Sequence, residues 1–126
     1  MEYVEAARRV GAGLTEAADD TTAAAAVQLA IEAWKCLAGT DLAWDHCGLE
    51  LLDIRARLYS EYDDVVVDAA APVRDDAETR LAVATLLEQL ARYHERLAVG
   101  NHEDLARRLS HDAGAQQLRR AAAALA

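Results

Sequence analysis

The stretch LAWDHCGLELLDIRARLYSEYDDVVV, residues 42–67, decides the fold of this chain. Its apolar residues recur every three or four positions, and they are Trp44, Cys47, Leu51, Ile54, Leu58, Tyr62 and Val65, with Leu52, Tyr59 and Val66 beside them. An α-helix has 3.6 residues per turn, so this spacing places the apolar residues along one face. We expect a helix of about six or seven turns here, with other helices covering its apolar face.

The composition of the whole chain favours helices over a sheet. Alanine makes up close to a quarter of the 126 residues, Phe is absent and Pro occurs once. Alanine has the highest helix propensity, and its small side chain lets neighbouring helices pack closely. The length suits a single domain, residues 1–126, that needs neither a disulfide nor a metal. We therefore predict an all-α fold, an antiparallel up-down four-helix bundle with a fifth or kinked C-terminal helix.

Four further helices are expected, at residues 2–18, 22–37, 76–98 and from 101 onward. The run from Asp19 to Thr22 precedes the second helix, and Asp41 precedes the third. Their side-chain oxygens can accept hydrogen bonds from the first amide groups of each helix. Gly39 is expected to end the second helix, and the short connection that follows predicts an antiparallel pair.

The pattern weakens after the third helix. The three valines at 65–67 allow two interpretations, a frayed helix end or an extended segment, since β-branched residues favour extended backbone. Asp75, followed three residues later by Glu78, predicts a capping box at the start of the fourth helix. Gly114 is expected to break the last helix, because the apolar spacing of residues 105–109 does not continue to Leu118.

Charge is distributed unevenly along the chain. The net charge is −9; residues 1–91 carry 7 basic and 18 acidic side chains, and residues 92–126 carry 6 and 4. An acidic protein repels nucleic acid and anionic membranes, so neither is an expected partner. The arginines at 107, 108, 119 and 120 would form one basic ridge on an unbroken helix. This ridge is interpreted either as a salt-bridged, solvated face or as a surface that docks on an acidic partner.

The N-terminal residues MEYVEAARR do not resemble a secretion signal, and no window of 18 residues is free of charge and apolar throughout. We therefore expect a cytoplasmic protein with reduced thiols. Cys36 and Cys47 flank the turn between the second and third helices. If both face inward, they would lie close enough for a disulfide; the other interpretation is two buried, unbonded cysteines.

A metal site is one hypothesis for the third helix. His46, Cys47 and Glu50 lie within one turn, and His46 and Glu50 share a face at i,i+4 spacing. A complete site would need ligands from another helix, and the candidates are Cys36, His94, His102 and His111. The other interpretation is an exposed His–Glu pair, and we expect no bound metal or cofactor.

A second hypothesis concerns Arg96 and His102, which are separated by the five residues LAVGN. This spacing resembles the Arg-x(4–6)-His signature of HEPN domains, which are small helical bundles that include dimeric RNA-cleaving toxins and nucleotide-binding relatives. The resemblance implies that Arg96 stabilises phosphate charge and that His102 transfers protons across a dimer interface. Leu97 occupies the place where those domains usually carry a polar residue.

The remaining features favour association over catalysis. The sequence contains no phosphate-binding glycine loop, nucleophile elbow or recognisable pair of catalytic carboxylates. His94 lies on the apolar face of the fourth helix, where a core histidine with satisfied hydrogen bonds is expected. The apolar faces of the third and fourth helices are wide enough that one small bundle is expected to leave part of them exposed. We therefore expect a non-enzymatic association module, a homo-oligomer such as a homodimer or a binder of another protein.

Overall fold

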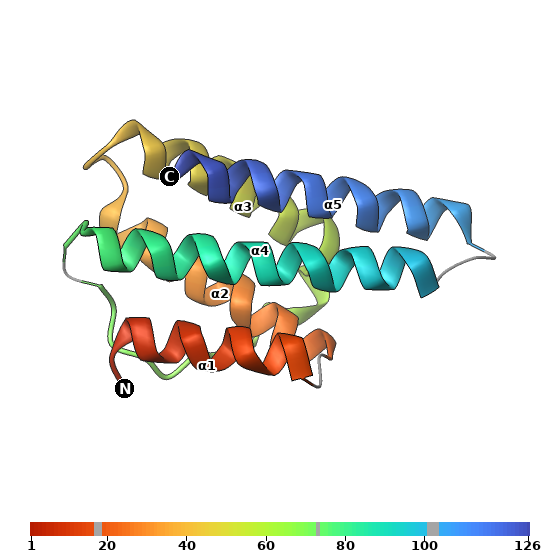
Figure 1. Cartoon of the computed structure of the whole chain (residues 1–126), viewed down its shortest axis with the longest axis horizontal. Helices are drawn as coiled ribbons and strands as arrows, with labels where there is room; N and C mark the ends of the chain where they lie inside the picture. The colour runs from red at the N-terminus through yellow and green to blue at the C-terminus, as the bar shows by residue number, and fades with distance from the viewer. Residues whose placement is uncertain (17–18, 73, 101–103) are drawn as a thin grey trace.

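The computed structural model describes residues 1–16, 19–72, 74–100 and 104–126. Over these ranges the chain forms five α-helices and one turn of 3-10 helix, with no β-strand: α1 (Tyr3–Glu16), α2 (Asp20–Leu37), α3 (Leu42–Leu58), η1 (Ser60–Tyr62), α4 (Ala77–Gly100) and α5 (Leu105–Ala124). Figure 1 shows the helices packed side by side. The prediction of an all-α protein is confirmed. The expected up-down order is not kept, because the segment after η1 crosses back along the bundle and α4 then runs in the same direction as α3 (Figure 1).

The long helix predicted over residues 42–67 is too long. α3 ends at Leu58, Tyr59 leaves the helical conformation at φ −128° and ψ 19°, and η1 follows. Residues 65–71 form neither helix nor strand, so Val65 to Val67 are not helical. The side chain of Tyr59 turns into the core, where it is 5% exposed. The β-branched valines that follow have a low helix propensity and do not restart the helix.

Most of the predicted helix ends are correct. Asp19 accepts a hydrogen bond from the Thr22 amide at 2.7 Å, and Asp41 accepts one from the Ala43 amide at 2.9 Å. Gly39, at φ +84°, terminates α2 in a conformation that glycine adopts without strain.

The cap of α4 lies one residue later than predicted. Asp76 accepts the hydrogen bond from the Thr79 amide, at 2.8 Å. Asp75 instead accepts from the guanidinium group of Arg80. Arg80 also reaches Asp41 at the start of α3, so it joins α4 to the α2–α3 turn. Asp75 is thus held by a side chain five residues further along, a contact that the capping-box pattern does not include.

The core is built from all five helices. In α3, the predicted residues Trp44, Cys47, Leu51 and Ile54 are all 0% exposed. The apolar face of α4 is covered as well, with Val83, Leu87 and Leu90 fully buried and Leu81 exposed outside it. The expectation that one bundle leaves the apolar faces of these two helices uncovered is therefore wrong for their central turns.

The packing brings α5 alongside α4, which is its most extensive contact, and against α3. α4 also packs against α1 and α2. The expected break at Gly114 is wrong, because α5 is continuous from Leu105 to Ala124. Gly114 is buried, and a Cβ added there would lie 2.8 Å from Cδ1 of Leu58. The glycine therefore allows α5 to approach α3 closely.

The end of α4 and the start of α5 project beyond the ends of α1, α2 and α3, on the right in Figure 1. Accordingly, residues 104–109 are all exposed. Within the described ranges, no helix is both long and apolar enough to span a bilayer.

Candidate functional site

The residues of the metal hypothesis do not meet further ligands. His46 is exposed, Cys47 is buried, and Glu50 forms an ion pair with Arg120 of α5 at 3.6 Å. Among the described residues, no three His, Cys, Asp or Glu side chains come together as metal ligands. Cys36 is exposed while Cys47 is buried, so the condition for a disulfide, that both face inward, is not met.

Arg96 takes part in a contact between helices. Its guanidinium group donates a hydrogen bond to the backbone oxygen of Leu14 at 2.8 Å, which joins α4 to the end of α1. His102 lies outside the described residues. The joint arrangement of Arg96 and His102 therefore stays a prediction.

Tyr59, His94 and His111 form a chain of titratable side chains joined by hydrogen bonds. The Tyr59 hydroxyl lies 2.5 Å from Nε2 of His94, and Nδ1 of His94 lies 3.0 Å from Nδ1 of His111. The two imidazole rings stack, with centroids 5.2 Å apart and an interplanar angle of 28°. Tyr59 directly follows α3, His94 lies in the second half of α4, and His111 lies in the first half of α5. Helix packing alone brings them together.

These hydrogen bonds restrict the protons of the chain. One imidazole must donate from Nδ1 and the other must accept, because two protonated Nδ1 atoms would repel each other at this distance. Whether Nδ1 of His111 donates or accepts, its hydrogen-bond partner is Nδ1 of His94. Nε2 of His111 is then the nitrogen directed away from the buried partner, because the two nitrogens lie on opposite sides of Cε1.

Burial sets the electrostatics of the chain. Burial, and secondly the neighbouring His111, lowers the pKa of His94 to about 4. The pKa of His111 is also lowered, first by burial and then by the positive charge of Arg107. Burial raises the pKa of Tyr59 well above its usual range. All three groups are therefore uncharged at neutral pH.

A second layer of hydrogen bonds lies beside the chain. Asp20, the first residue of α2, accepts hydrogen bonds from the hydroxyl of Tyr93 and, at 3.3 Å, from that of Tyr62. The ring of Tyr93 packs edge-on against His94, with centroids 5.4 Å apart. The carboxylate of Asp20 is thus occupied by two phenols rather than by a cation.

An open cavity of about 320 Å³ is lined by this chain, since Tyr59, His94 and His111 all contribute to its wall. Its α5 wall carries Arg107, Ser110 and His111, which share one helix face at i, i+3 and i+4. Ser60 of η1 contributes another hydroxyl to the lining. Several hydrogen-bond donors from two elements therefore surround one small space.

Sequence reasoning identified only part of this site. The interpretation of His94 as a core histidine with hydrogen-bond partners is confirmed, at 2% exposure. The sequence predicts His111 only as a possible metal ligand from another helix, and Tyr59 only as part of the α3 face. Tyr59 is 35 residues from His94, and His111 is 17 residues from it, so no local spacing signals the contact.

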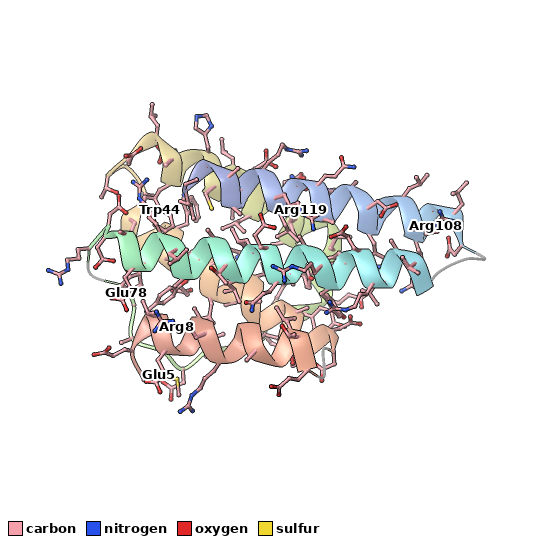
Figure 2. The ribbon with its side chains drawn as sticks, viewed as in Figure 1. Glu5, Arg8, Trp44, Glu78, Arg108 and Arg119 are labelled. Carbon is pink, nitrogen blue, oxygen red and sulfur yellow. The ribbon has the colours of Figure 1, made fainter. Side chains whose placement is uncertain are left out.

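The basic ridge of α5 divides into two halves. Arg119 forms ion pairs with Glu88, at 3.5 Å, and with Glu95, both on α4. Arg107 and Arg108 form no ion pair with the described residues. Figure 2 shows Arg108 on the projecting end and Arg119 further along α5. The salt-bridged interpretation holds for the second half of the ridge and not for the first.

Exposed apolar side chains gather on the same projecting end. Val99 near the end of α4 is 67% exposed, and Leu105 and Leu109 of α5 are 65% and 59% exposed. Isolated exposed apolar residues are normal, but three near the free end of one helix pair form a candidate contact surface. We call these three residues the apolar tip.

Comparisons with known proteins yielded no match: no protein-family model, curated protein or solved structure resembles this chain.

Proposed function

We propose that this chain is a protein-association module that forms a homodimer through the projecting end of α4 and α5. The observation that carries the proposal is the apolar tip, formed by Val99, Leu105 and Leu109, on a helix pair that extends past the other helices (Figure 1). Apolar side chains at such a place gain stability when a partner covers them, at about 25 cal/mol per Å² removed from water.

A second copy is the proposed partner because the surface is complementary to itself. Successive helix residues are about 100° apart, so Leu105, Arg108, Leu109 and Asp112 share one stripe on the side of α5 away from the buried Leu118. An interface with two-fold symmetry brings the same stripe of both copies together. With the two α5 helices antiparallel and Leu109 near the axis, Arg108 of each copy faces Asp112 of the other. Leu109 of both copies then lies at the centre of the contact with the charge pairs beside it, and Leu105 of each copy packs further along the partner helix.

The apolar faces of α3 and α4, which suggested association from the sequence, do not support this proposal. Their central residues are covered within the chain. The proposed interface relies instead on the ends of α4 and α5, where no other helix of the chain reaches (Figure 1).

The proposal includes the finer architecture. We infer a single domain, in a protein that works in the cytoplasm, in which α1, α3 and α4 run in one direction and α2 and α5 in the other (Figure 1). The short connection between α2 and α3 supports the antiparallel order, since α2 ends at Leu37 and α3 begins at Leu42. The parallel order of α1 and α4 is supported by two contacts: Arg8 pairs with Glu78 near the start of α4, at 3.7 Å (Figure 2), and Arg96 near the end of α4 reaches Leu14 near the end of α1.

Sedimentation velocity and light scattering over a range of protein concentrations test the dimer. Leu109→Glu introduces one negative charge from each copy close to the two-fold axis, so we expect the dimer dissociation constant to rise more than about tenfold. Leu49→Glu is the matched control, because Leu49 of α3 is 68% exposed but lies outside the apolar tip. Circular dichroism checks that both variants remain folded.

A wild-type chain that is monomeric at every concentration overturns the proposal. It is equally overturned if Leu49→Glu dissociates the dimer as strongly as Leu109→Glu, since the interface then lies elsewhere.

A further inference from the structure

We propose that the cavity over His111 binds a small oxyanion, a carboxylate or a tetrahedral phosphate or sulfate group, through Arg107, Ser110 and His111. This inference concerns a different surface from the apolar tip and does not depend on the dimer. It rests on the arrangement of the donors, on the state of the neighbouring carboxylates and on the hydrogen bond that orients His111.

The three donors form a compact set on one face of α5. Arg107, Ser110 and His111 follow at i, i+3 and i+4 and all line the cavity. Arg107 has no ion pair with any described residue, so its guanidinium group can bind an anion without breaking a bridge. A guanidinium and a hydroxyl together bind the oxygens of a carboxylate or phosphate through short, charge-assisted hydrogen bonds.

The negative groups near the cavity do not occupy these donors. Asp20 accepts hydrogen bonds from Tyr62 and Tyr93. Glu61 of η1 is exposed, so solvent screens its charge. The remaining arginine of the lining, Arg57, is bound to Asp53 and Gln117. Of the two arginines that line the cavity, Arg107 is therefore the one whose guanidinium group can bind a ligand.

His111 is oriented to serve as the third donor. Its Nδ1 is held by His94 at 3.0 Å, so its Nε2 faces away from the core. Without an anion, burial and Arg107 keep the pKa of His111 low and the ring neutral. A bound anion opposes the charge of Arg107 and favours the imidazolium, which donates a further hydrogen bond.

Binding should therefore be linked to proton uptake by His111. The charged groups that line the cavity beside the ring are Asp20 from α2, Arg57 from α3, Glu61 from η1 and Arg107 from α5, and the charge of Asp112 acts on the ring from the next position of α5. Its neutral neighbours are Tyr59 and His94, joined by the hydrogen-bonded chain. Among these groups only the two histidines have ordinary pKa values close to neutral pH, and His94 is held neutral by burial.

Nuclear magnetic resonance titrations of the full chain with sodium sulfate and with sodium acetate, at constant ionic strength, test the site. Both probes keep their charge between about pH 6 and about pH 8, so any pH dependence belongs to the protein. We expect saturable shifts of the His111 ring resonances with at least one probe and tighter binding at the lower pH. Sulfate alone indicates a tetrahedral ligand, and acetate alone indicates a carboxylate.

Two variants locate the site. Arg107→Gln should weaken binding about tenfold, the effect of losing one charge-assisted contact. Arg92→Gln is the matched control: it removes the same charge from an exposed position on α4 outside both the cavity and the apolar tip, and it should leave affinity unchanged. The proposal is overturned if neither probe shifts His111 in a saturable way, or if Arg92→Gln weakens binding as much as Arg107→Gln. Because the titration can be followed on monomer or dimer, its failure is distinct from failure of the dimer proposal.

Discussion

The stability of this protein is expected to fall between neutral and mildly acidic pH, because His94 is buried in its uncharged form. The residue is 2% exposed, and burial, followed by the neighbouring His111, lowers its pKa from 6.5 to about 4. A histidine with a lowered pKa in the folded state binds a proton more readily after unfolding. Stability is therefore fully present above the unfolded pKa and is lost as the pH falls from 6.5 towards 4.

The size of the loss follows from the two pKa values. At about 1.4 kcal/mol for each pH unit between them, the full loss is roughly 3 kcal/mol, and roughly 2 kcal/mol of it is complete by about pH 5. The carboxyl groups of Asp19, Asp41 and Asp53 have pKa values below 3.8, so they lose their stabilising charge only in stronger acid. The lowered pKa of His111 adds to the loss in the same direction.

Urea unfolding at about pH 7.5 and at about pH 5, followed by circular dichroism and tryptophan fluorescence, measures this difference. His94→Gln removes the titrating group, so most of the difference of roughly 2 kcal/mol should disappear. The variant is less stable at both pH values because hydrogen bonds to Tyr59 and His111 are lost. His46→Gln, on the exposed surface of α3, is the control and should keep the wild-type difference. Equal wild-type stability at the two pH values, or an undiminished difference in His94→Gln, refutes the reasoning.

Three further predictions concern the core. Leu51→Ala removes a fully buried side chain and should lower the free energy of unfolding, measured with urea, by about 2–5 kcal/mol. Leu49→Ala is the control: Leu49 is 68% exposed, so the free energy of unfolding should change by no more than about 0.5 kcal/mol. Similar losses in the two variants would contradict the packing of α3. Gly48→Ala should lower the melting temperature although Ala favours helices, because the added Cβ would lie 2.1 Å from the indole nitrogen of Trp34 on α2. A higher melting temperature would argue against this close contact. A thiol reagent should modify Cys36 in the native protein and Cys47 only after unfolding, because Cys47 is buried and burial raises the pKa of its thiol to about 12. Equal rates of modification of the two cysteines in the native protein would contradict the burial of Cys47.

The local structure was largely predictable because its determinants lie within a few residues of one another. The helical spacing of Trp44, Cys47, Leu51 and Ile54 identified the buried face of α3. Asp19 and Asp41 could be recognised as caps because a cap needs only an acceptor side chain before the first free amides. The errors lie where another side-chain contact competes with the expected pattern. Asp75 is bound by Arg80, five residues along the chain, and Tyr59 leaves the helix to contact His94, 35 residues away.

The candidate site was predictable only in part for the same reason. The apolar spacing of α4 placed His94 in the core, but its partners depend on which helices are neighbours. The sequence predicts a helix break at Gly114, because a glycine that ends a helix cannot be distinguished by sequence from one that makes room for a side chain of a neighbouring helix. Of the residues in the two alternative hypotheses, His46 is exposed, and Glu50 and Arg96 each contact another helix.

The sequence by itself determined that this chain is helical, where most of its helices begin and end, and which faces they bury. Only the tertiary structure decided that α5 lies beside α4, that two histidines share one hydrogen bond, and that the ends of α4 and α5 project beyond the other helices. The physical reason is the alanine-rich surface of these helices. Small side chains allow close packing in many relative positions, so the contacts between helices depend on the fit of the whole core and not on any local pattern.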